Sequence, residues 1–262
     1  MDKEEVKITL KETFQSVLDK TKSSFSFWST SPDFLNLQTS LVNLGTIVDY
    51  GYLGGMIIPY IQHLLVESKR NRFSENVQDL DKKFLAAGTI HTDFAQSELG
   101  HKIFEHTFKT FIEQENKSKI EAQKLFLLNS FTNLDIDEEL ASSYQDTLIS
   151  LRPLELQIFQ ALFSPDKMIE QIFELKFPKG DDYTVFSLKT DIMNYLHIEE
   201  HLFEKSIKQL ISADLITEKE ISIPWSSGNF HKSNMSQIMD RAKTDAHRLI
   251  TNYGKNFMES IT

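Results

Sequence analysis

Lys102-Ile-Phe-Glu-His-Thr-Phe-Lys-Thr-Phe-Ile-Glu-Gln114 is the stretch of sequence that decides the fold class. Charged and polar residues separate apolar ones at the spacing of a single helical face. The apolar set is Ile103, Phe104, Phe108, Phe111 and Ile112. A helix with this pattern turns one side to a core and the other to water. The stretch therefore predicts an amphipathic helix that packs against neighbours.

The same pattern continues on both sides of this stretch. Residues 120–131 carry a second apolar set at helical spacing. Ser31-Pro32 and Ser164-Pro165 each place an N-cap residue before a proline, a pair that is typical of a helix start. We therefore expect a body of several packed helices.

The C-terminal part has a different pattern. Turn-forming residues at 178–182 precede two expected helices, over 188–196 and 198–213. Ile221-Ser222-Ile223 alternates like a strand, and Arg248-Leu249-Ile250 is expected to pair with it. Two helices followed by a hairpin are the order of a winged helix-turn-helix. The expected fold class is therefore mainly α, a multi-helix body with a C-terminal winged-helix-like module that carries a small β-hairpin.

The expected domains are a helical domain over 1–150 and a winged-helix-like domain over 151–262. The chain of 262 residues is long enough for this division, because domains commonly contain about 100–200 residues. Its composition, 40% hydrophobic and 25% charged, excludes disordered and collagen-like classes.

Charge and cysteine content exclude further classes. Lys and Arg number 28 against 38 Asp and Glu, so the net charge is −10 and broad binding to phosphate backbones is disfavoured. The absence of cysteine excludes disulfides, thiol catalysis and zinc ribbons. The first residues, Met1-Asp-Lys-Glu-Glu5, do not resemble a signal peptide, and we expect a cytoplasmic protein.

One uncharged segment stands out, Gly51-Tyr-Leu-Gly-Gly-Met-Ile-Ile-Pro-Tyr-Ile-Gln-His-Leu-Leu-Val66. It is shorter than the about 20 apolar residues that span a bilayer. One interpretation is a buried core helix over 56–66 after a glycine-rich loop. The other is a membrane-surface or conditionally exposed segment, because basic residues follow it directly. The candidate membrane or partner contacts are Tyr52, Met56, Ile57, Ile58, Ile61, Lys69, Arg70 and Arg72.

The expected winged helix raises a second hypothesis, contact with DNA. The helix over 198–213 would enter the major groove, but its first turn contains Glu199 and Glu200, which repel phosphates. A wing is the remaining basic surface, and its candidate contacts to DNA or a partner are Lys232, Arg241 and Lys243. We therefore favour a module that contacts proteins over one that reads DNA.

Motifs that carry chemistry are weak in this sequence. His197-Ile-Glu-Glu-His201 has the spacing of an inverted zinc-peptidase motif, but a third ligand is missing. Glu98-Leu-Gly-His101 has the spacing of half a di-iron site, but a second copy is missing. Exposed histidines on helices explain both. Nucleophile elbows and phosphate-binding glycine loops are absent, so we predict no catalytic residue, no metal and no cofactor.

Three segments give a family resemblance. They are Glu67–Phe73 after the glycine-rich segment, Leu151–Ile158, and Leu249–Ile261 at the end of the chain. With them, the pattern from Gly51 to Thr262 resembles the Abi-alpha (abortive infection alpha) family, a bacterial domain. The resemblance implies antiphage defence by growth arrest or death of the infected cell, and it supplies no catalytic residues. Residues 1–50 lie outside it.

The expected function is that of a non-enzymatic antiphage-defence protein that acts through protein or membrane-surface contacts. Its alternative is a winged-helix transcription regulator. A protein partner is the first expectation, a membrane surface the second and nucleic acid the last. The expected location is the cytoplasm, with a peripheral position at the inner face of the cell membrane as the alternative.

Overall fold

The structure is a computed structural model that describes residues 11–12, 16, 32–63, 67–133, 137–164, 186–217, 224–226, 244 and 249–262. Two compact units divide the chain, residues 1–145 and 146–262, and the division falls inside helix α8 (Glu138–Ser150). The expected domain boundary after residue 150 stays a prediction.

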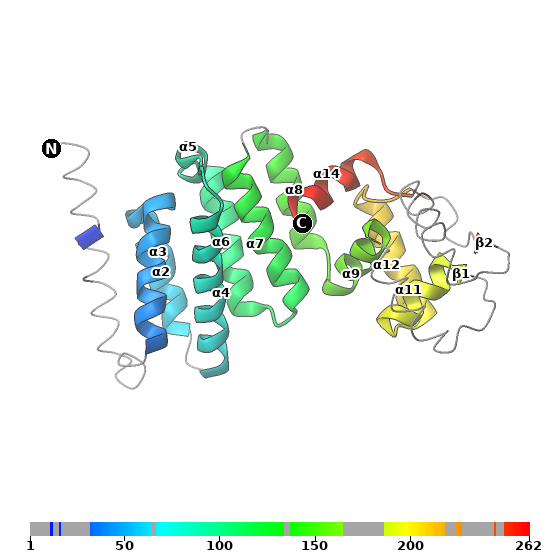
Figure 1. Ribbon diagram of the computed structural model, residues 1–262, viewed down its shortest axis with the longest axis horizontal. Helices are drawn as coiled ribbons and strands as arrows, with labels where there is room; N and C mark the ends of the chain where they lie inside the picture. Colours follow the sequence, from blue (N-terminus) through cyan, green and yellow to red (C-terminus); the bar gives the residue numbers. More distant parts are fainter. Residues whose placement is uncertain are drawn as a thin grey trace. The chain divides into compact units, whose positions relative to one another are not determined.

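The first unit is a stack of helices. Figure 1 shows four of its longer helices side by side, and helix–helix contacts link them in the order α2, α4, α6, α7. The elements of this unit are α2 (Pro32–Val48), α3 (Tyr50–His63), α4 (Glu67–Ala86), α5 (Thr92–Ala95), α6 (Glu98–Glu113), α7 (Lys117–Thr132) and most of α8.

Helix α6 is the centre of this stack and forms as its sequence predicts. The five apolar side chains of its stripe are all buried. Ser97 caps its first turn, because the side-chain oxygen accepts a hydrogen bond from the backbone N–H of Gly100 at 3.1 Å. Aromatic pairs fill the core: Phe104 stacks on Phe108 at 4.5 Å between ring centroids, and Phe73 meets Phe108 edge to face at 5.7 Å.

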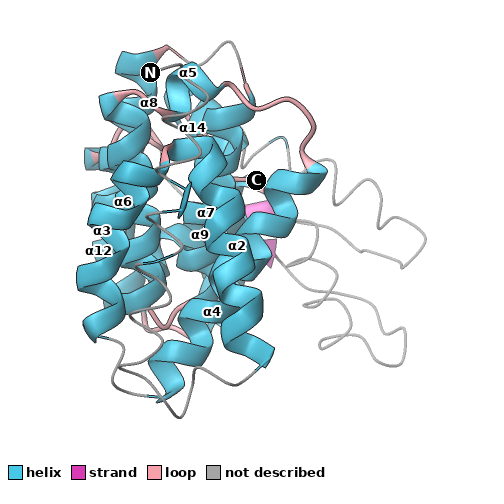
Figure 2. Cartoon of the chain, turned by 90° about the vertical axis from the view of Figure 1, so that its left-hand side faces the viewer, coloured by secondary structure: helices cyan, strands magenta, loops and turns pink. Residues whose placement is uncertain are grey.

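The second unit contains shorter elements. They are α9 (Pro153–Phe163), β1 (Phe186–Ser187), α11 (Leu188–Leu196), α12 (Glu200–Ser212), β2 (Pro224–Ser226) and α14 (Asn252–Ser260). Phe159 of α9 and Phe257 of α14 meet in the core, with ring centroids 6.2 Å apart. Figure 2 shows that helices make up nearly all of the described elements, and the strands form one small pair. The expected mainly helical class is therefore confirmed.

The expected winged-helix module with its β-hairpin is wrong. Ile250 forms a single bridge with Ile216, and the expected partner strand 221–223 lies outside the described residues. The only sheet in the described part of the chain joins β1 to β2, which are separated in sequence by α11 and α12. Strands of two and three residues that pair over this distance do not make a hairpin, which needs adjacent strands joined by a turn. A brief apolar alternation does not specify a strand partner. The DNA-binding alternative loses its structural basis with this module.

Candidate functional site

The uncharged segment that begins at Gly51 forms most of helix α3, which begins one residue earlier at Tyr50. Its glycines lie within the helix and not in a preceding loop, which corrects the loop expected before residue 56. Tyr50, Leu53 and Met56 are buried in the first unit, whereas Gly51 and Gly55 are exposed. A Cβ atom built on Gly55 meets no atom within 4 Å. We call the exposed side at Gly51 and Gly55 the glycine face of α3.

A one-residue corner places α3 against α2. Asp49 adopts φ +84°, a left-handed conformation that reverses the chain between the two helices. Its carboxylate caps α3, because Oδ1 accepts hydrogen bonds from the backbone N–H groups of Gly51 at 2.7 Å and Tyr52 at 3.1 Å. Gly45 of α2 lies under the ring of Tyr50, where a Cβ atom would stand 2.4 Å from the ring. The burial of Tyr50 raises the pKa of its phenol.

Near this corner, Tyr52 of α3 contacts His101 of α6. We call this pair the clasp. The two rings stack with centroids 3.8 Å apart and planes 5° from parallel. The Tyr52 hydroxyl donates to the backbone oxygen of His101 at 2.8 Å. His101 Nε2 lies 3.0 Å from the backbone oxygen of Val48, one of the last carbonyls of α2, which have no partner within their own helix.

The other residues expected to contact a membrane or a partner differ in their exposure to solvent. Lys69 is exposed at the start of α4, but Arg70 beside it is buried. Arg72 donates from Nη2 to the backbone oxygen of Ile112 at 3.1 Å and lies 3.4 Å from Glu115. Three other expected contacts lie in α3 by their backbone, and their side chains are outside the described residues: Ile57, Ile58 and Ile61. The structure thus places Tyr52, Met56, Arg70 and Arg72 in intramolecular contacts.

A groove between α4 and α7 has no counterpart in the sequence predictions. Its volume is about 400 Å³. Charged and amide side chains make up most of its lining: Ser68, Asn71, Arg72, Glu75, Asn76, Glu115, Lys117, Ile120, Glu121 and Lys124. The sequence shows only that charges recur along both segments, which is equally typical of any solvated helix face.

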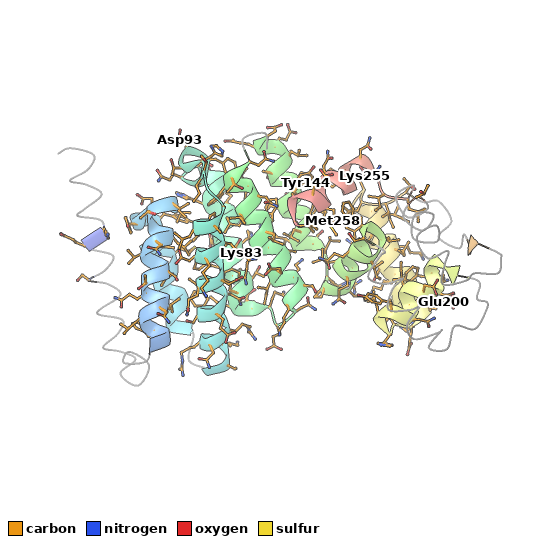
Figure 3. The ribbon with its side chains drawn as sticks, in the orientation of Figure 1. Lys83, Asp93, Tyr144, Glu200, Lys255 and Met258 are labelled. Carbon is orange, nitrogen blue, oxygen red and sulfur yellow. The ribbon has the colours of Figure 1, made fainter. Side chains whose placement is uncertain are left out.

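Ion pairs cross between α4 and α7 beside this groove. Lys124 is only 5% exposed, and its Nζ donates to Asp79 Oδ2 at 2.7 Å. Lys83, which is labelled in Figure 3, lies 2.8 Å from Glu121. The hydrogen bond to Glu121 raises the pKa of Lys83 more than its partial burial lowers it. These pairs fasten the two helices to each other, and they engage Lys124 and Glu121 of the groove lining.

The two histidine motifs do not form metal sites in the described structure. His197 ends α11 with φ +53°, and the backbone N–H of Ile198 donates to the oxygen of Met193, a common helix-ending arrangement. His201 lies on the next helix, exposed, with Nδ1 3.1 Å from Glu199. The zinc-peptidase motif needs both histidines on one helix, so the match in spacing is accidental.

The Glu98–His101 motif, which has the spacing of half a di-iron site, also has structural roles. Glu98 is exposed and lies 2.7 Å from Lys102, while His101 belongs to the clasp. Among the described residues, no group of three acidic or histidine side chains is arranged to hold a metal ion. The wing candidates Lys232, Arg241 and Lys243 lie outside the described residues.

Comparisons with known proteins do not place this chain in a family. No family model, curated protein or solved structure matches it. Within the part of the chain that the structure describes, no helix combines the length and the apolar character needed to cross a membrane.

Proposed function

We propose that this protein is a non-enzymatic antiphage-defence protein that acts through a protein partner, with the glycine face of α3 as its contact surface. The defence setting rests on the resemblance to the abortive-infection family. The observation that carries the contact surface is the two-sided arrangement of α3. Tyr50, Leu53 and Met56 anchor one side, and the opposite side exposes Gly51 and Gly55.

Two exposed glycines one turn apart leave this part of α3 without Cβ atoms, which allows another backbone to approach closely. The open space around Gly55 leaves this approach free. Small residues allow such close contact between packed helices. A partner helix that lies against this side is therefore the geometry that we propose.

A protein partner is favoured over a lipid surface by the position of the basic residues. A polybasic segment gains about 1 kcal/mol for each Lys or Arg near an anionic membrane. Arg70 is buried and Arg72 is engaged with Ile112 and Glu115, so Lys69 alone of these three cations extends into solvent. The net charge of −10 further opposes attraction to anionic lipid.

The test fills the glycine face without disturbing the core. Gly55→Trp places a large ring where the structure has open space, and Leu85→Trp on α4 is the matched control at a side chain that is 71% exposed. Bacteria that carry the full chain are infected with a panel of phages, and plating efficiency is measured with circular dichroism of each purified protein. We expect Gly55→Trp to lose protection, whereas Leu85→Trp retains it and both stay helical.

Two outcomes contradict parts of this proposal. Full protection by Gly55→Trp excludes the glycine face as the contact surface, and the absence of protection by the unchanged chain excludes the defence role.

A third arm tests the membrane alternative by flotation with phosphatidylcholine vesicles, with and without phosphatidylglycerol. Flotation that disappears when Ile57, Ile58 and Ile61 are all changed to Asp identifies lipid, and not protein, as the partner.

A further inference from the structure

The groove between α4 and α7 has the size of a small-molecule site. Its volume of about 400 Å³ falls within the range of about 300–1,000 Å³ that such sites occupy. The lining residues of each wall recur at the spacing of one helix face, so each wall is a continuous strip of side chains. Ile120 of α7 is the one apolar residue among the described lining residues, and it is buried. The polar and charged groups of the lining therefore determine which ligand the groove can bind.

Some charges of this lining are already paired within the protein. Arg72 forms an ion pair with Glu115, and Lys124 forms one with Glu121. Each of these two cations also donates to an acceptor outside the lining. Their charges are therefore largely neutralised before any ligand enters the groove.

Glu75 and Lys117 are the charges of the lining that remain. Glu75 lies on the α4 wall and Lys117 on the α7 wall, and both are exposed. Within the described structure neither side chain forms an ion pair or a hydrogen bond, so the two do not pair with each other across the groove. The side chains of Asn71 and Asn76 on the α4 wall also have no hydrogen-bond partner there. The groove thus has an unpaired anion on one wall, an unpaired cation on the other, and two free amides on the wall of the anion.

We propose that this groove binds a zwitterionic dipeptide. An ion of a single sign is attracted by one wall and repelled by the unpaired charge of the other, whereas a zwitterion is attracted by both. The ammonium group of the peptide lies against Glu75, and its carboxylate lies against Lys117. A side-chain amide carries both donors and an acceptor, so Asn71 and Asn76 match the N–H and C=O groups of the peptide bond. This site is separate from the glycine face of α3 and does not depend on the proposed defence role.

A titration of the full chain with alanyl-alanine, followed by nitrogen-15 NMR of the backbone amides, tests this assignment. We expect saturable shifts in the residues of α4 and α7 that line the groove. N-acetylalanyl-alanine lacks the ammonium group and alanyl-alanine amide lacks the carboxylate. We expect each to bind about tenfold more weakly, because one charge-assisted hydrogen bond is lost. Inorganic phosphate, an anion without an ammonium group, should bind no more tightly than the acetylated peptide.

Two substitutions test the two walls separately. Glu75→Gln should weaken the binding of alanyl-alanine about tenfold and leave the affinity for N-acetylalanyl-alanine unchanged. Lys117→Met should weaken the binding of alanyl-alanine to a similar extent and leave the affinity for alanyl-alanine amide unchanged. Glu139→Gln on α8 and Lys109→Met on α6 are the matched controls, since both residues are exposed and lie outside the groove lining. Circular dichroism of each variant verifies that the helices remain.

Several results overturn the assignment. One is the absence of saturable shifts with alanyl-alanine, and another is saturation at residues outside the groove lining. Equal affinities for alanyl-alanine and its two blocked forms exclude recognition of a zwitterion. An effect of Glu75→Gln or Lys117→Met that is no larger than that of its control excludes the two walls as the binding groups.

Discussion

At the scale of single residues, two glycines in neighbouring helices have opposite roles. Gly45 is required by the close approach of Tyr50, because a Cβ atom at Gly45 would lie 2.4 Å and 2.6 Å from ring atoms. Gly55 has no such neighbour, so it is free of any packing requirement. Sequence alone does not distinguish these two roles, because it does not show what packs against each glycine.

Alanine at these two positions should therefore change stability in opposite directions. We expect Gly45→Ala to lower the free energy of unfolding by about 1–3 kcal/mol, because the buried ring must move. We expect Gly55→Ala to raise it by up to about 1 kcal/mol, because alanine favours the helix. Urea denaturation followed by circular dichroism measures both. Equal effects of the two substitutions would contradict the packing of Tyr50 on Gly45.

At the scale of elements, a buried ammonium joins α4 to α7. Lys124 donates to Asp79, and its Nζ also lies 5.7 Å from the centroid of the Phe111 ring. Removal of one partner from a buried pair usually costs more than replacement of both, because the remaining charge stays desolvated.

Asp79→Asn tests this pair. Asp79 is 46% exposed and Glu121 remains 3.6 Å from Lys124, so we expect a loss of about 1–2 kcal/mol, less than for a fully buried pair. Lys124→Met in the Asp79→Asn background should recover part of this loss in chemical denaturation. A double variant that is less stable than Asp79→Asn would show that the ammonium itself stabilises the interface between the helices.

A second ion pair joins α11 to α12 and gives a pH dependence. The hydrogen bond from Lys189 lowers the pKa of Glu200, and Glu200, ahead of Glu204, raises the pKa of Lys189. Glu200 is labelled in Figure 3. A lowered carboxyl pKa contributes stability above its unfolded value, and that contribution is lost as pH falls through the folded pKa. The raised pKa of Lys189 acts in the alkaline range, where its contribution is lost as pH rises through the folded value.

Titration of the Glu200 side chain by carbon-13 NMR should therefore give a midpoint below the ordinary value of 4.5. Lys189→Met should return the midpoint toward that value, whereas Lys208→Met, elsewhere on α12, should leave it unchanged. An unshifted midpoint in the unchanged chain would exclude the pairing between α11 and α12 in solution.

At the scale of the whole molecule, the two compact units suggest separate stabilities. Gly254 lies in the first turn of α14 near the Ile216–Ile250 bridge, and a Cβ atom there would stand 2.2 Å from the backbone oxygen of Leu215. A backbone atom cannot move aside as a side chain can. Gly254→Ala therefore perturbs the second unit specifically.

We expect Gly254→Ala to destabilise the second unit by about 3 kcal/mol. Hydrogen exchange should accelerate in α12 and α14, while α6 keeps the protection of the unchanged chain, if the units unfold independently. Acceleration of α6 to the same extent would show that 1–145 and 146–262 unfold as one cooperative body. The same measurement tests the expected domain division at residue 150.

Patterns along the sequence predict some elements of this chain correctly and others not. The amphipathic helix around Phe104 and Phe108 could be predicted, because its period is a local property of the sequence. The strand partner of Ile250 could not, because pairing between strands depends on which distant segments meet. The helical state of Gly51–Gly55 was also hidden, since their intrinsic propensity favours a loop and the capped corner overrides it.

The sequence by itself determined the helical class, the amphipathic stripe of residues 102–114 and the absence of cysteine chemistry. These follow from composition and from spacing along one segment. Only the tertiary structure decided that Arg70 is buried, that His101 stacks on Tyr52, and that charges from α4 and α7 meet across a groove. Each of these contacts joins residues on different elements or depends on what covers them, and no periodicity within one segment encodes which residues come together in space.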